Sequence, residues 1–338
     1  MKVLLIKTSS LGDVFHTLPA LEDAYRAIDG LQVDWVVEEA FAAIPQWHPA
    51  VNQVIPVAWR RWRKSLLNKT TRAEMSAFRQ QLRSNEYDVV LDAQGLIKSA
   101  IITRMAHGPR YGLDKNSCRE PWAARAYQFP QAVAKGQHAI PRVRQLFAAV
   151  LGYDIPQGLS YGVDRTRWQR PGIDGDYWIF LHGTTWITKL WPEAYWRELA
   201  ALAAQSGRQV LLPWGNEEEF QRAGRIADGL TGVDVLPKMG LNELNAYLAH
   251  AQAVAGVDTG LSHVVAALEV PSVAIYGATD ATLTGVLGPQ VEVMRSHYSD
   301  CAPCLSKTCL KNEPGDIQPP CYREISPQRV FDSLLQRI

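Results

Sequence analysis

The chain has 338 residues, of which 47% are hydrophobic and 20% are charged. This composition is typical of a folded protein of about two domains and excludes a mainly disordered chain. The 35 Lys and Arg residues nearly balance the 34 Asp and Glu residues, and the formal net charge of +1 gives no basic excess that would indicate nucleic-acid binding.

The charge is divided unevenly along the chain. Residues 1–150 hold 20 Lys and Arg against 13 Asp and Glu (+7), and the remaining residues hold 15 against 21 (−6). This opposition suggests that the two halves meet different partners, with an anionic partner at the first.

The apolar run at residues 3–6 is too short for a signal peptide, and no stretch of about 18 apolar residues predicts a membrane span. We therefore expect a cytoplasmic protein whose membrane contact is peripheral.

Strand and helix patterns alternate along the first part of the chain. Short β-branched runs at residues 3–6, 33–37 and 89–91 predict buried parallel strands. Amphipathic stretches at residues 18–28 and 73–82 predict helices between them. The alternation predicts an α/β domain over residues 1–152.

The periodicity lapses over residues 153–176, where Gly and Pro recur, so this segment is predicted to be an interdomain linker. The alternation then restarts, which predicts a second α/β domain over residues 177–325. Its expected strands are residues 177–181, 210–212, 253–257 and 273–276, and its expected helices are residues 193–205 and 217–227. Residues 326–338 predict a terminal helix, with Ser326 as the cap and Pro327 in the first turn.

Several common catalytic motifs are absent from the chain. No G-x-G-x-x-G follows the first strand of either domain, which disfavours a dinucleotide-dependent dehydrogenase. Walker A, H-E-x-x-H and G-x-S-x-G motifs are missing as well. Their absence disfavours P-loop NTPases, zinc proteases and serine hydrolases.

The first expected strand leads into a loop that contains Asp13. Ligands of open α/β sheets bind at the carboxyl ends of strands, so this aspartate is a candidate general base. It could equally cap the next helix with its carboxylate.

A basic cluster follows between Trp59 and Lys64. It consists of Arg60, Arg61, Arg63 and Lys64, and Lys98 and Arg119 could extend it. Guanidinium groups suit phosphate and carboxylate oxygens, so the cluster fits an anionic substrate. The alternative is a solvated basic surface.

Polar residues also follow strands of the second domain. Thr184, Thr185 and Lys189 at one helix start, and Asp258 and Gly260 at another, are residue types that can cradle a phosphate. Each segment alone could be an ordinary turn between a strand and a helix. Residues 217–219 are all glutamates. One of them could bind ribose hydroxyls, or they could simply stabilise the positive N-terminal end of the helix dipole.

Four of the five cysteines lie close together in the sequence, namely Cys301, Cys304, Cys309 and Cys321. Four thiolates suit a closed tetrahedral site for structural zinc or iron, with no open position for catalysis. Unligated thiols and disulfides are the alternatives.

The chain resembles the bacterial lipopolysaccharide heptosyltransferases in motifs that span nearly its whole length. The motif DTGLSH at residues 258–263 marks the wider family, and KTSSLGDVFHTLPAL at residues 7–21 and RRWRK at residues 60–64 resemble the type I heptosyltransferases. Further similar segments are WVVEE at 35–39, VIPV at 54–57, DAQGL at 92–96, LPWG at 212–215 and LPKM at 236–239.

This resemblance implies a GT-B fold, in which two Rossmann-like α/β domains face each other across a cleft and the C-terminal helix crosses back to the first domain. It implies an inverting glycosyltransferase that moves L-glycero-D-manno-heptose from ADP-heptose to the first Kdo of Kdo2-lipid A in lipopolysaccharide inner-core synthesis. The enzyme would need no cofactor for catalysis and would work at the cytoplasmic face of the inner membrane as a peripheral protein.

The resemblance also assigns roles to residues. Asp13 would be the base, and the acceptor would contact Arg60, Arg61, Arg63, Lys64 and Arg119. The donor would contact Thr184, Thr185 and Lys189 through its diphosphate, Glu219 through its ribose, Met239 near its adenine, and Asp258, Thr259, Gly260 and His263 on its heptose side.

Two segments depart from the type I pattern. Residues 186–188 are more apolar than the charged stretch of the family. The four-cysteine segment is foreign to the enterobacterial type I enzymes, whereas relatives that glycosylate proteins bind iron in similar segments. Alternative functions are a heptosyltransferase with another acceptor (heptosyl-lipopolysaccharide or protein), a nucleotide-sugar epimerase of the same fold, and a non-catalytic nucleotide- or lipopolysaccharide-binding scaffold.

Overall fold

The computed structural model describes residues 1–298, 301–311 and 313–338. The chain forms two compact units, Met1–Asp164 and Arg165–Ile338, and the division falls inside the segment predicted as a linker. None of the helices among these described residues is long and apolar enough to cross a membrane.

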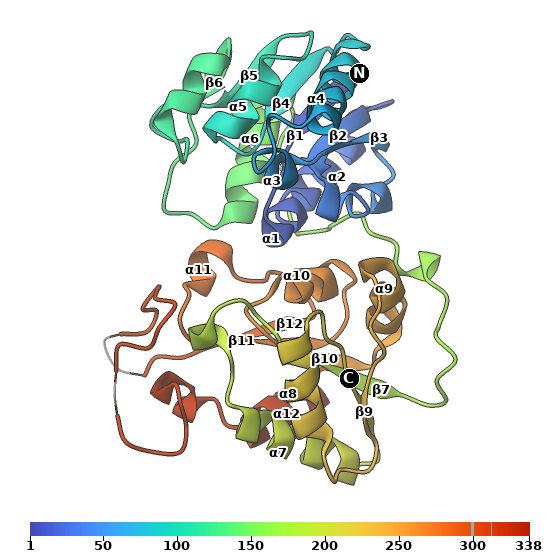
Figure 1. Cartoon of the computed structure of the whole chain (residues 1–338), viewed down its shortest axis with the longest axis vertical. Coiled ribbons are helices and arrows are strands. Elements are labelled where there is room, and N and C mark those ends of the chain that lie inside the picture. The colour runs from blue at the N-terminus through green and yellow to red at the C-terminus, as the bar shows by residue number, and fades with distance from the viewer. Residues whose placement is uncertain (299–300, 312) are drawn as a thin grey trace. The chain divides into compact units, whose positions relative to one another are not determined.

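The first unit is built on a parallel sheet with the strand order β3-β2-β1-β4-β5-β6 (Figure 1). Its strands are β1 (Lys2–Ile6), β2 (Gln32–Glu38), β3 (Val51–Val57), β4 (Val89–Asp92), β5 (Arg110–Leu113) and β6 (Phe129–Gln131). Its helices are α1 (Leu11–Phe15), α2 (Leu18–Ala27), α3 (Trp59–Trp62), α4 (Lys69–Arg83), α5 (Ile97–Thr103) and α6 (Ala139–Leu151), with short 3-10 turns η1 (Glu39–Phe41), η2 (Pro45–Trp47) and η3 (Pro121–Ala126).

The second unit repeats this design with the strand order β12-β11-β10-β7-β8-β9. Its strands are β7 (Tyr177–Leu181), β8 (Gln209–Leu212), β9 (Val233–Val235), β10 (Ala253–Val257), β11 (Ser272–Tyr276) and β12 (Val291–Arg295). Its helices are α7 (Glu193–Gln205), α8 (Glu217–Ala227), α9 (Leu241–His250), α10 (Gly260–Ala267), α11 (Ala281–Thr284) and α12 (Pro327–Leu335), with 3-10 turns η4 (Arg165–Arg167), η5 (Ile187–Lys189) and η6 (Pro320–Glu324).

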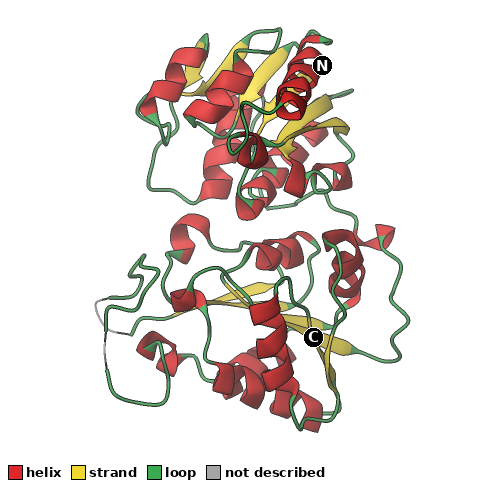
Figure 2. Cartoon of the chain, viewed as in Figure 1, coloured by secondary structure: helices red, strands yellow, loops and turns green. Residues whose placement is uncertain are grey.

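Each sheet is buried between helices, as Figure 2 shows for the strands in yellow and the helices in red. In the first unit Leu4 and Ile6 of β1 pack with Phe78 of α4. In the second unit Trp178 and Phe180 of β7 pack with Trp196 of α7. Burial on both faces explains why the strands read as continuous apolar runs, and the predicted pair of α/β domains is confirmed.

The terminal helix α12 begins as the sequence predicts. Ser326 caps it as predicted, by accepting a hydrogen bond from the Arg329 backbone N–H at 3.3 Å, and Pro327 opens its first turn. Its apolar residues Val330 and Leu334 are buried in the core of the second unit, where α12 packs against α7, β10 and β11. That core supplies the apolar partner which its amphipathic face requires. That the chain crosses back to the first domain here stays a prediction.

Candidate functional site

The first candidate site lies at the carboxyl ends of β1 and β4, where the strand order of the first sheet changes direction. Ligands of open α/β sheets bind at such points. The loops after these strands are joined because the backbone N–H groups of Thr8 and Ser9 donate to Gln94 Oε1, at 3.0 and 3.2 Å. Asp13, in α1, follows this junction.

Asp13 caps the helix in which it lies, as one of the sequence hypotheses proposed. Its Oδ2 accepts hydrogen bonds from the Ser10 backbone N–H at 2.7 Å and from Ser10 Oγ at 3.0 Å. The side chain nevertheless keeps 34% of its surface exposed. Capping therefore fixes one carboxylate oxygen and leaves the group accessible to a substrate hydroxyl.

Lys7 faces the other carboxylate oxygen and was missed as a site residue from the sequence. Its buried Nζ donates to the Ala93 carbonyl at 3.0 Å and lies 4.0 Å from Asp13 Oδ1. Burial lowers the pKa of Lys7, and the carboxylates of Asp13 and Asp92 act in the opposite direction. From the sequence alone, a lysine that follows a buried strand cannot be told apart from a lysine exposed on the surface.

Lys98 and Arg60 reach the same site from α5 and α3. Lys98 Nζ donates to Ser9 Oγ at 2.9 Å, and burial lowers the pKa of Lys98 while nearby Glu38 raises it. The Arg60 backbone N–H donates to Glu38 Oε1 at 2.9 Å, and its guanidinium lies 5.4 Å from the Phe41 ring centre. Both cations therefore stand beside the β1/β4 loops.

The remaining cations of the basic cluster are not equivalent. Arg61 forms ion pairs with Glu39 at 3.1 Å and Glu74 at 2.8 Å, and its hydrogen bonds to these carboxylates raise its pKa. Its charge is thus already neutralised within the unit. Arg63 and Lys64 are exposed and form no ion pair among the described residues. Arg119 is exposed too and is one of the charges that act on Lys7.

The second candidate site lies at the carboxyl ends of β7 and β10, the switch point of the second sheet. Lys189 Nζ and Asp258 Oδ2 form an ion pair at 2.7 Å. Thr184 Oγ1 donates to the Asp258 carbonyl at 2.9 Å, and Thr279 Oγ1 donates to Asp258 Oδ2 at 2.5 Å. The structure therefore brings Thr184, Lys189 and Asp258 together, and it adds Thr279, which no sequence motif indicated.

The N-terminus of α10 borders this site. Thr259 is its N-cap residue and Gly260 its first residue, and the Ser262 backbone N–H donates to the Thr259 carbonyl at 3.2 Å. Ser262 Oγ donates to the Val257 carbonyl at 2.8 Å, which ties the helix to β10. The His263 side chain is buried in the same helix, and Thr185 is exposed on the loop after β7.

Glu219 lies beside the end of β7, although it belongs to α8. Its Oε2 accepts a hydrogen bond from the Gly215 backbone N–H at 2.8 Å, and its own N–H donates to Asn216 Oδ1 at 3.0 Å. A Cβ placed on Gly183 would stand 2.6 Å from the Glu219 carboxyl carbon, so any larger residue there would force the Glu219 side chain to move. Met239 is half-buried in the loop after β9.

His182, directly after β7, is fully buried. Burial lowers its pKa to about 4, and the nearby Arg222 acts in the same direction. The ring is therefore neutral at pH 7, and its burial makes it part of the support for the loop that carries Thr184.

The four clustered cysteines are free thiols that line one small cavity together with Thr188. Burial and the neighbouring thiols raise the pKa of Cys321 to about 12, so it is protonated at pH 7. Within the described ranges, no three His, Cys, Asp or Glu side chains form a group that could hold a metal ion. The metal site stays a prediction.

The cysteine segment also supports the second site. Thr188 Oγ1 donates to the Ser306 carbonyl at 2.5 Å, and Tyr322 Oη donates to the Thr188 carbonyl at 3.0 Å. These bonds hold η5, whose last residue is Lys189.

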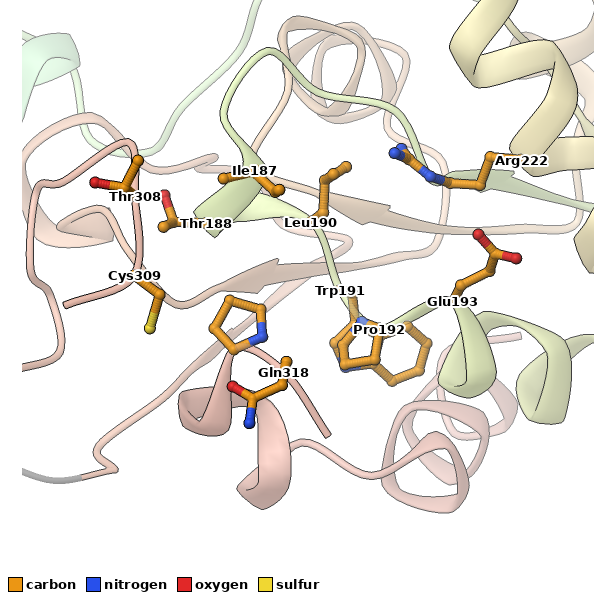
Figure 3. Close-up of a pocket in the computed structure, with 11 residues that line it drawn as sticks. Ile187, Thr188, Leu190, Trp191, Pro192, Glu193, Arg222, Thr308, Cys309 and Gln318 are labelled. Carbon is orange, nitrogen blue, oxygen red and sulfur yellow. The ribbon is translucent and has the colours of Figure 1, made fainter. Parts of the chain in front are cut away.

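A cavity of about 460 Å³ lies between η5 and the cysteine segment, and Figure 3 shows the side chains that line it. Ile187 and Trp191 come from η5 and the segment after it, Arg222 comes from α8, and Cys309 and Gln318 come from the cysteine segment. The residues predicted to bind the donor are not among its lining residues, so the cavity and the second site are separate features.

Comparisons with known proteins agree with this geometry. Residues 75–313 match glycosyltransferase family 9 (heptosyltransferase). The chain is 50% identical to lipopolysaccharide heptosyltransferase 1 of Pseudomonas aeruginosa over 349 residues, which cover 99% of this chain and 97% of that protein.

Two solved structures share the fold over most of their length. Escherichia coli heptosyltransferase WaaC with ADP superposes with a TM-score of 0.85 at 50% identity, covering 88% of this chain and 93% of that one. The same enzyme with ADP-2-deoxy-2-fluoro heptose superposes with a TM-score of 0.85 at 44% identity, covering 100% of both chains.

Proposed function

Because the chain belongs to glycosyltransferase family 9, the heptosyltransferases, we propose that it transfers L-glycero-D-manno-heptose from ADP-heptose to the first Kdo of Kdo2-lipid A. It is a glycosyltransferase of lipopolysaccharide biosynthesis. Two observations support the finer assignment. The first unit has an accessible, oriented carboxylate at its switch point. The second unit has a lysine and a helix N-terminus at its own switch point.

Asp13 is the general base in this proposal. As the Kdo hydroxyl attacks C1 of the heptose, Asp13 takes the hydroxyl proton, the new O–C1 bond forms, and the bond from C1 to the diphosphate oxygen breaks. Attack from the side opposite the leaving group inverts the anomeric centre. Ser10 supports the role because it holds Oδ2 and so orients the carboxylate.

Lys189 and the first turn of α10 stabilise the departing ADP. Negative charge develops on the diphosphate as the C1–O bond breaks, and an ammonium with helix-end N–H groups is suited to it. Because Lys189 contacts Asp258, the diphosphate must draw the lysine away from this carboxylate or share it. Thr185 supplies a hydroxyl donor at the same loop. The Thr184 hydroxyl donates to the Asp258 carbonyl in this structure, so it would have to turn to donate to the diphosphate.

The ends of the donor contact different elements. Glu219 accepts hydrogen bonds from the ribose hydroxyls, Met239 contacts the adenine, and Asp258, Thr259, Gly260 and His263 face the heptose. Arg60, Arg63, Lys64 and Arg119 bind the carboxylates and phosphates of the acceptor. Arg61 has a lesser share, because Glu39 and Glu74 hold its guanidinium.

The four cysteines hold a structural zinc or iron ion. Thiolates are suitable ligands for either metal, and the four side chains border a common cavity. All ligands would be protein atoms, and the proposed transfer steps use only the chain's own groups. Elemental analysis of untagged protein purified without chelators tests this; a stoichiometry near zero for both metals contradicts it.

The enzyme is cytoplasmic and meets its lipid acceptor as a peripheral protein at the inner membrane. The test of the function is ADP release from ADP-heptose, followed with and without Kdo2-lipid A. Acceptor-dependent release supports the proposal. Release that needs heptosyl-lipopolysaccharide or a protein acceptor assigns another substrate, and binding of ADP-heptose without release on any acceptor indicates a scaffold.

A further inference from the structure

Helix α5 carries a residue of the first site and two exposed apolar side chains. Lys98 directs its ammonium to Ser9 Oγ at 2.9 Å, whereas Ile97 and Ile101 are 47% and 41% exposed. The two isoleucines are four residues apart and so share one side of the helix. One short helix therefore connects the first site with an apolar surface.

The neighbouring turn η3 extends this surface. It packs against α5, and its Trp122 is 64% exposed. The Arg125 guanidinium lies 3.7 Å from the centre of the Trp122 ring. We define the α5–η3 face as Ile97, Ile101 and Trp122 with the cations Lys115, Arg119 and Arg125.

The charge on this face is positive. Its three cations are exposed and form no ion pair within the part of the chain that the structure describes. The nearby carboxylates are engaged by backbone N–H groups: Asp114 Oδ1 accepts from Ser117 at 2.8 Å, and Glu120 Oε2 accepts from Ile97 at 2.7 Å. Lys115 also acts electrostatically on Asp114. The face thus holds three exposed cations against these two carboxylates, with apolar side chains nearby.

We propose that the α5–η3 face docks on an anionic lipid bilayer, so that the first site is held beside a membrane-embedded acceptor. The inference rests on the proposed function, because the acceptor assigned there is a lipid. Tryptophan and basic side chains with apolar stems favour the boundary between headgroups and acyl chains. Each cation near an anionic surface strengthens binding about fivefold.

A cavity beside Trp122 fits the same occupant. Its volume is about 480 Å³, and Lys115 and Arg125 belong to its walls. Asp114 also lines it, so a headgroup phosphate entering it would meet two cations and one carboxylate. In the proposed docking, the exposed Ile97 and Ile101 would contact the acyl region. The face therefore offers separate partners for the polar and the apolar part of a lipid surface.

Vesicle binding tests the docking surface directly. The protein and its Trp122→Glu and Ile101→Glu variants are sedimented with vesicles of phosphatidylglycerol and phosphatidylethanolamine, and with phosphatidylcholine alone. The control is Ile155→Glu, because Ile155 is 40% exposed but lies outside the face. We expect each face variant to bind the anionic vesicles about tenfold more weakly and the control to bind normally. Unchanged binding by both face variants overturns the proposal.

Turnover separates this inference from the proposed function. Face variants should lose ADP release with Kdo2-lipid A in anionic vesicles and keep it with a water-soluble, deacylated acceptor. Equal loss on both acceptors overturns the docking role, since the face would then support the first site itself. If the unmodified protein releases no ADP with either acceptor, the proposed function fails while vesicle binding still decides the face. A dimer that Trp122→Glu dissociates in sedimentation velocity assigns the face to a second copy and overturns the proposal.

Discussion

The two sheets have the same strand pattern around their switch points but arrange charge there in different ways. At the first, Lys7 Nζ stays 4.0 Å from Asp13 Oδ1, an oxygen that accepts no hydrogen bond among the described residues. At the second, Lys189 Nζ contacts Asp258 Oδ2 directly, at 2.7 Å. The first arrangement leaves a carboxylate oxygen available to take a proton. The second holds a cation in place until an anion replaces its partner. Under the proposed function, the two sheets would thus serve different chemical tasks through the residues of their loops.

The largest effect should come from removing the base at the first switch point. Asp13→Asn keeps the shape of the side chain and its position in α1 but cannot take the proton. We expect turnover to fall about 10³-fold. ADP-heptose binding, measured by calorimetry, should be unchanged because the proposed donor site lies at the second sheet. Near-normal turnover would remove Asp13 from the role of base.

The matching change at the second switch point is Lys189→Ala. Loss of the ammonium should cost about 3 kcal/mol of transition-state stabilisation, or roughly a hundredfold in kcat. Asp258→Asn breaks the same ion pair but keeps the cation, so its kcat should fall less. Equal losses in the two variants, measured under saturating donor, would mean that the intact pair matters more than the free lysine.

Acid should affect the two units in opposite directions. Burial raises the pKa of Asp92 in the first unit, so lowering the pH relieves a buried charge there. Burial lowers the pKa of His182 to about 4, against 6.5 for an exposed histidine. The stability that neutral His182 contributes is complete above pH 6.5 and is lost as the pH falls toward 4, at a total cost of about 3 kcal/mol.

Amide hydrogen exchange can measure how the stability of each unit depends on pH. Amides of β7 should lose protection between pH 6.5 and 4, after correction for the intrinsic rate, more than amides of β4. His182→Asn should abolish most of this difference, and the exposed His107→Asn should not. Identical pH profiles for β7 and β4 would contradict the assignment.

A smaller effect is expected at Gly183, where the backbone lies close to the Glu219 side chain. In Gly183→Ala the new methyl group would collide with the Glu219 carboxylate. We expect the KM for ADP-heptose to rise about tenfold, equivalent to about 1.4 kcal/mol of binding. Gly224→Ala is the matched control in α8, because a Cβ there meets open space. A KM raised equally in both variants would indicate a general effect on α8.

The smallest effect should distinguish the cations of the first unit. Lys64→Ala should raise the KM for the acceptor severalfold, because this ammonium has no ion-pair partner within the described ranges. Arg61→Ala should raise it less, since Glu39 and Glu74 already neutralise that guanidinium. The reverse order, in kinetics with varied acceptor, would show that the acceptor displaces these glutamates.

Much of the fold could be predicted because buried parallel strands appear in the sequence as short, local runs of apolar residues. β1, β2, β4, β7, β8, β10 and β11 were all expected close to their observed positions. β6 and β9, of three residues each, were missed because a run so short carries little periodicity. β12 lies at the edge of its sheet and buries Met294, while its other four residues are half-exposed or exposed, so its hydrophobic signal is weak.

The candidate site was partly predictable for the same reason. Asp13, Thr184, Lys189 and Asp258 each follow a recognisable strand, and strand ends meet at one edge of a parallel sheet. Lys7 and Thr279 were not found, since their importance depends on neighbours from other loops, namely Asp13 and Asp258.

The sequence by itself determined the two α/β domains, the strand-end positions of most candidate residues and the cap of α12, because each depends on residues that are near one another in the chain. Only the tertiary structure decided that Arg61 is held by two glutamates, that Glu219 lies against Gly183, and that α12 packs in the second unit. These depend on contacts between residues far apart in the chain. Burial and charge pairing act through space, so no local pattern encodes them.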